Sequence, residues 1–124
     1  MQMILPSTDD IQMFCYTSGT TGDSKAAMLS NKNFMSAASA LLMVPGLKIS
    51  ENDTLVSYLP LAHAYEKVIC CTGILVGAEI GYYSGDTLQL LSDVQELKPT
   101  FFPSVPRLFN KIYDKINRSL KEKT

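Results

Sequence analysis

The chain has no tryptophan, one histidine and three cysteines, and this scarcity excludes several kinds of site. Cys15, Cys70 and Cys71 form no C-x-x-C pair, and His63 stands at no metal-ligand spacing from them. We therefore expect reduced thiols, no disulfide framework and no metal site, as is typical of intracellular proteins.

Long apolar runs are also missing. The longest, residues 68–78, is interrupted by Thr72 and is too short for a membrane-spanning helix, which needs about 20 residues. The first ten residues lack a basic segment followed by an apolar one, so we expect no signal peptide. Any membrane attachment is expected to be peripheral, and a net charge of −1 gives no reason to expect a nucleic-acid partner.

The remaining composition is typical of a globular core. Of the 124 residues, 46% are hydrophobic and 19% are charged, which suits one domain or part of one. The patterns predict strands at 11–16, 26–30, 54–59, 79–83 and 100–102, and helices at 31–44, 64–76, 88–97 and 106–121. Strands and helices alternate from residue 54 onward, which predicts an α/β fold with a mostly parallel sheet.

Two of the predicted helices carry apolar faces whose packing has to be assigned. In the helix at 88–97, Leu88, Leu91, Val94 and Leu97 are expected to face inward. The last helix has an apolar stripe at helical spacing, formed by Leu108, Phe109, Ile112, Tyr113, Ile116 and Leu120. We expect this stripe to pack on the sheet; the alternative is a helix on a membrane surface, because Lys111, Lys115, Arg118 and Lys121 lie mostly away from it.

The segment Tyr16–Lys25, with the sequence YTSGTTGDSK, is the strongest candidate binding site. Glycines let the backbone approach a ligand closely, successive N–H groups can converge on an anion, and hydroxyls and a lysine add donors. A polyphosphate such as that of ATP fits this chemistry. The loop is not a Walker A loop, because Ser24 and Ala26 flank the lysine. The expected phosphate-binding residues are Thr17, Ser18, Gly19, Thr20, Thr21, Gly22 and Lys25.

A second candidate follows the strand that ends near Pro60. The segment Ser57–Lys67 reads SYLPLAHAYEK, so His63 comes directly after the strand and Glu66 follows three residues later. Ligands of open α/β sheets gather beyond the carboxyl ends of the strands, which would place His63 at the mouth of the same cleft as residues 17–25. A structural role for a lone histidine stays open at this point.

These segments together resemble the adenylate-forming, or AMP-binding, enzymes. YTSGTTGDSK is similar to their phosphate-binding signature, and SYLPLAH is similar to a second core motif in its long-chain fatty acyl-CoA synthetase version. Two further segments also resemble that branch: GYYSGD at Gly81–Asp86 and LKPTFFPSVPRLFNKIY at Leu97–Tyr113.

The resemblance implies both a fold and a reaction. Residues 1–124 would form an incomplete portion of the N-terminal adenylation domain, with the phosphate loop at 16–25. The implied activity is that of an acid–thiol ligase, in which a fatty acid is adenylated with ATP and then transferred to coenzyme A, with Mg²⁺ as a further cofactor. His63, the candidate catalytic residue, would lie near the acyl carboxylate and the adenylate.

The resemblance also implies that other parts of the machinery lie elsewhere. The family's YGxTE-like motif, its ribose-binding aspartate and its C-terminal lysine have no counterpart here, so we expect a fragment that is inactive alone and whose partner is the remainder of the ligase. The expected location is intracellular, either cytoplasmic or peripheral on a membrane such as the endoplasmic reticulum. Two alternatives stay open: a non-catalytic nucleotide- or protein-binding module, and an unrelated phosphate-binding NTPase.

Overall fold

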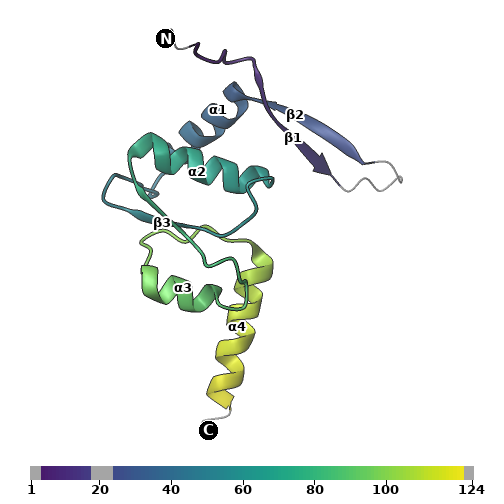
Figure 1. Cartoon of the computed structure of the whole chain (residues 1–124). Helices are drawn as coiled ribbons and strands as arrows, with labels where there is room; N and C mark the ends of the chain where they lie inside the picture. Colours follow the sequence, from purple (N-terminus) through teal and green to yellow (C-terminus); the bar gives the residue numbers. More distant parts are fainter. Residues whose placement is uncertain (1–3, 18–23, 122–124) are drawn as a thin grey trace.

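The computed structural model describes residues 4–17 and 24–121. This part of the chain contains four strands and four helices (Figure 1). In chain order they are β1 (Ile11–Thr17), β2 (Lys25–Ser30), α1 (Asn31–Leu42), β3 (Thr54–Ser57), α2 (Ala64–Val76), β4 (Glu79–Tyr82), α3 (Leu90–Leu97) and α4 (Pro106–Lys121).

The first two strands form an antiparallel pair of their own. Thr17 at the end of β1 lies opposite Lys25 at the start of β2. Figure 1 shows this pair extending away from the part of the molecule that holds the other elements. The pairing fixes the two ends of the connection between β1 and β2, although residues 18–23 lie outside the described part.

The second sheet confirms the parallel arrangement expected from residue 54 onward. Strands β3 and β4 pair in parallel, with Leu55 opposite Ile80, and a parallel bridge joins Leu55 to Phe101. Phe101 thus marks the short strand predicted at 100–102. Among the described residues β1 and β3 belong to different sheets, so they are not the parallel neighbours that would make their ends open on one side.

Strand β3 is buried on both faces, as is usual for parallel sheets. Leu55 packs in one cluster with Ile49 and Ile69, while Val56 packs in another with Tyr58 and Leu90. Consecutive strand residues point to opposite faces, so β3 lies between a layer containing α1 and α2 and a layer containing α3 and α4 (Figure 1).

Helix α2 approaches this sheet closely and ends where the sequence predicts. A Cβ on Gly73 would lie 3.1 Å from Cδ1 of Ile80, so only a glycine permits this contact without a shift of its neighbour. Gly77 terminates the helix with φ of 75°, in the left-handed region that favours glycine. The N-cap of α1 is Ser30, whose Oγ accepts a hydrogen bond from the Asn33 N–H.

The two C-terminal helices differ from the sequence expectation in what they bury. Leu90 is the buried residue of α3, whereas Leu88 precedes the helix and is 91% exposed. No described residue of α4 is fully buried. At the start of the helix Leu108 packs against the cluster of Val56, Tyr58 and Leu90, and Phe109 contacts Phe102, whereas Tyr113, Ile116 and Leu120 are more than half exposed. The expected packing of the stripe on the sheet therefore holds only for the first turn of α4. Helical spacing defines an apolar face but does not determine what covers it.

A side-chain bridge stabilises the start of β3 and gives a pH-dependent prediction. The Asp53 carboxylate accepts hydrogen bonds from the Thr100 hydroxyl at 2.7 Å and from the Ser50 backbone N–H at 2.8 Å. These bonds, that from Thr100 first, lower the pKa of Asp53 below its ordinary value of 3.8. The contribution to stability is therefore present above that value and is lost as the pH falls through the lowered pKa.

We expect Asp53→Asn to reduce the dependence of the unfolding free energy on pH in this acidic range. Urea unfolding at a series of pH values below 5 measures the slope. Equal slopes for the wild-type chain and the variant would contradict the assignment.

Candidate functional site

The expected phosphate-binding residues fall on the β1–β2 hairpin. The structure describes the backbone of Thr17 and the position of Lys25, which pair across the hairpin. The other five residues lie outside the described part: Ser18, Gly19, Thr20, Thr21 and Gly22. The phosphate-loop assignment therefore stays a prediction, supported by strands that hold its two ends together.

His63 is exposed and occupies the N-cap of α2. Its Nδ1 accepts a hydrogen bond from the Tyr65 N–H at 3.2 Å, and its own backbone N–H donates to the Pro60 carbonyl at 2.8 Å. The turn formed by residues 60–63 thus places the His63 imidazole at the start of α2. The sequence predicted the position after the strand but not the capping role.

One contact joins the hairpin to the segment that carries His63. The Cys15 thiol on β1 lies 3.9 Å from the carbonyl oxygen of Ala62, the residue before His63. This contact brings β1 alongside the β3–α2 connection just before the strand reaches Thr17. A single cleft containing both the His63 ring and residues 17–25 stays a prediction.

A buried polar cluster lies beside this connection, and neither its burial nor its contacts were predicted from the sequence. Glu66 is 1% exposed, and the hydroxyl of Ser57, the last residue of β3, donates to its Oε1 at 2.5 Å. The Cys70 thiol lies 3.8 Å from the same carboxylate oxygen. The available signal was helical spacing, because Glu66 shares the inward face of α2 with Ile69, Cys70 and Gly73.

The environment of Cys70 makes its thiol a donor rather than a nucleophile. Burial raises the pKa of this thiol above its ordinary value of 9.0, and the hydrogen bond with Ser57 only partly opposes that shift. The neutral S–H can therefore point to the Glu66 carboxylate or to the Ser57 hydroxyl. Cys15, Cys70 and Cys71 are all free thiols.

The described residues hold no group of three or more His, Cys, Asp or Glu side chains that could bind a metal ion. None of the described helices is both long and apolar enough to cross a membrane.

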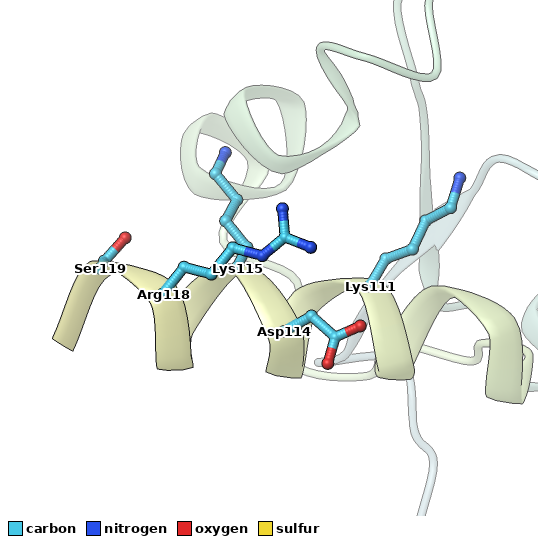
Figure 2. A pocket seen from close by; sticks show the side chains of 5 residues that line it. All are labelled: Lys111, Asp114, Lys115, Arg118 and Ser119. Atoms are coloured by element: carbon cyan, nitrogen blue, oxygen red, sulfur yellow. The ribbon is translucent and has the colours of Figure 1, made fainter. Parts of the chain in front are cut away.

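Two hollows on the surface of the described part lie away from these segments. One of about 280 Å³ is lined only by α4 residues, and Figure 2 shows its Lys111, Asp114, Lys115, Arg118 and Ser119. A second of about 610 Å³ lies between α3 and α4 and is lined by Leu91, Val94, Ile112 and Ile116, among others. Neither contains a residue of the expected phosphate loop or His63, so we do not assign a nucleotide to them.

Comparison with known proteins places the chain in a family. The family model described as "AMP-binding enzyme" matches residues 2–124. The chain is 43% identical over 113 residues to long-chain-fatty-acid–CoA ligase 1 of Cavia porcellus and 42% identical to the Homo sapiens protein of that name. Each match covers 90% of this chain but only 16% of the relative.

Two solved structures with a similar fold were determined with a nucleotide or an acyl-adenylate bound. ATP-bound MatB from Rhodopseudomonas palustris matches with a TM-score of 0.70 and 26% identity, over 87% of this chain and 21% of that one. The o-succinylbenzoate CoA synthetase of Bacillus subtilis, in complex with an acyl-adenylate, matches with a TM-score of 0.73 and 21% identity, over 87% and 28% of the two chains. These findings confirm the resemblance and the α/β fold class, and the chain belongs to the AMP-binding enzyme family.

Proposed function

We propose that this chain supplies the phosphate-binding and carboxylate-binding segments of a long-chain fatty acid–CoA ligase. The observation that carries the proposal is the contact between Cys15, the residue before the segment Tyr16–Lys25, and Ala62 in the segment that carries His63. The names of the relatives support the substrate class. The chain spans about a sixth of those relatives, so the complete activity is part of the proposal.

The proposed reaction has two steps. A fatty acid carboxylate attacks the α-phosphorus of ATP, which gives an acyl-adenylate and releases pyrophosphate. The thiol of coenzyme A then attacks the acyl carbon and releases AMP. Residues 17–25 would hold the β and γ phosphates, where preorganised N–H groups and a positive charge stabilise the developing negative charge.

His63 would act at the acyl carboxylate. Its Nδ1 is engaged by the Tyr65 N–H, so the neutral ring carries its proton on Nε2 and can donate there to an anion. This assignment makes the imidazole a positioning donor rather than a general base. The proposal assigns no residue of this chain to Mg²⁺ or coenzyme A.

A segment-swapped ligase tests this function. In it, residues 2–124 of this chain replace the matching segment of the human long-chain-fatty-acid–CoA ligase 1. Exchange of pyrophosphate into ATP that depends on a long-chain fatty acid such as palmitate would support the proposal. An inactive swapped enzyme that folds would contradict it, while ADP formation would favour an NTPase and binding without turnover a non-catalytic module.

His63→Asn in the swapped ligase distinguishes two roles of His63: a hydrogen-bond donor to the ligand and the N-cap of α2. Asparagine is a favourable N-cap, so α2 keeps its start while the imidazole donor is lost. We expect the exchange rate to fall by about two- to tenfold, the effect of losing a hydrogen bond worth ~0.5–1.5 kcal/mol, with the melting temperature unchanged. Normal exchange per folded molecule would show that His63 has only a structural role.

A further inference from the structure

Glu66 has no charged hydrogen-bond partner among the residues that the structure describes. Its described partners are the Ser57 hydroxyl and the Cys70 thiol, both of which are neutral donors. Burying a carboxylate costs free energy even when it is hydrogen-bonded, and apolar residues of similar volume are often equally or more stabilising. Packing alone therefore does not explain a glutamate here.

The position of Glu66 in the helix is informative. It is the third residue of α2, where a glutamate side chain often turns back to the N-cap backbone N–H as part of a capping box. Here the N-cap N–H of His63 donates instead to Pro60, and the Glu66 carboxylate turns inward to the end of β3. The Ser57–Glu66 hydrogen bond thereby closes the connection of residues 58–63 that carries His63.

The next link runs through the backbone of the first turn. Tyr65, directly before Glu66, donates its N–H to Nδ1 of His63, and Lys67, directly after it, donates its N–H to the His63 carbonyl at 3.2 Å. Both N–H groups belong to the first turn of α2, and the Ser57–Glu66 hydrogen bond joins this turn to the end of β3. An occupied Nδ1 leaves the proton of the neutral ring on Nε2.

We propose that Glu66 is a positioning residue for His63: by anchoring the first turn of α2 to Ser57, it selects the imidazole tautomer that donates from Nε2. The role of that donor toward an acyl carboxylate rests on the proposed function above. The tautomer selection itself does not, because it depends only on contacts within this chain.

The chain offers a direct measurement, since His63 is its only histidine and its ring signals need no assignment. Long-range ¹H–¹⁵N correlation spectra of the 124-residue chain, recorded above the titration of the ring, report the ratio of the Nε2–H to the Nδ1–H tautomer. We expect the Nε2–H form to dominate in the wild-type chain and in Glu66→Gln, whose amide oxygen can still accept from Ser57.

Two variants remove the anchor. Glu66→Met fills a similar volume without an acceptor, and Ser57→Ala removes the donor. In each, the tautomer ratio is expected to fall roughly two- to tenfold, as for the loss of one ordinary hydrogen bond. Glu96→Met, at an exposed glutamate of α3, is the matched control and should leave the ratio unchanged.

Backbone amide spectra of the same samples establish whether each variant is folded. An unchanged tautomer ratio in folded Glu66→Met or Ser57→Ala would overturn the proposal, as would a wild-type ratio equal to that of a free imidazole. If neither variant folds, Glu66 is a stability residue and the proposal fails. If only one of the two variants folds, the tautomer ratio of that variant tests the proposal.

The segment-swapped ligase separates this inference from the proposed function. Glu66→Met should lower the turnover of adenylation with little change in the KM for ATP, and it should add nothing in a His63→Asn background. An inactive swapped ligase with the expected spectra would reject the proposed function and keep the positioning role. An active swapped ligase whose variants keep the wild-type tautomer ratio would support the proposed function and reject the positioning role of Glu66.

Discussion

Lys25→Ala is expected to lower the rate of fatty-acid-dependent pyrophosphate exchange in the segment-swapped ligase by about one to two orders of magnitude. Lys25 opens β2 opposite Thr17, at the edge of the segment with the family's phosphate-binding signature. A charge-assisted hydrogen bond to a phosphate is worth ~1.5–3 kcal/mol, which corresponds to this loss of rate. Because Lys25 is exposed, its truncation should leave the unfolding free energy nearly unchanged.

The matched control for this prediction is Lys32→Ala. Lys32 is also exposed, but it lies in the first turn of α1 beyond the far end of β2. Its removal changes the net charge equally, so a general electrostatic effect on ATP would appear in both variants. Equal exchange rates for Lys25→Ala and the wild-type segment would show that the lysine does not face the phosphates.

Leu55→Ala is expected to have the largest effect on stability. Leu55 is 1% exposed in the middle of β3, packs with Ile49 and Ile69, and forms the backbone bridge to Phe101. Truncating a buried leucine costs ~2–5 kcal/mol, because apolar contacts are lost and a cavity remains. A small domain has a total stability of about 5–15 kcal/mol, so the variant should unfold at a much lower urea concentration.

Leu88→Ala provides the comparison with the same chemical change on the surface. Leu88 is 91% exposed, and its truncation should alter the unfolding free energy by at most about 0.5 kcal/mol. Circular dichroism during urea unfolding of both variants measures the difference. A similar loss of stability at Leu55 and Leu88 would mean that the leucine of β3 is not in the core.

Several elements of the fold were predictable from local sequence signals. The bounds predicted for the helices at 64–76 and 106–121 match α2 and α4. Each is delimited by residues with a backbone preference: Gly77 adopts a positive φ after α2, and Pro106 suits the first position of α4. At the start of α1, Ser30 and Asn31 were both possible caps by residue type, and the structure has Ser30, whose hydroxyl accepts from a helix N–H.

Which side chains of α3 and α4 are buried was not predictable from local signals. Leu88 and most of the apolar stripe of α4 have the spacing of buried residues, yet in the described part of the chain Leu88, Tyr113, Ile116 and Leu120 are more than half exposed. Periodicity reports which residues share a face, and burial depends on which other element lies against that face. The same limit applies to the sheets, since strand patterns do not specify whether β1 pairs with β2 or with β3.

The sequence by itself determined the family, the two candidate segments and most element boundaries, because motifs, caps and turn residues act over a few neighbouring positions. Tertiary structure decided how these pieces meet. It placed Cys15 of β1 against Ala62, and it buried Glu66 against Ser57. Both contacts join residues on different elements, so they depend on how those elements pack together and not on any local pattern.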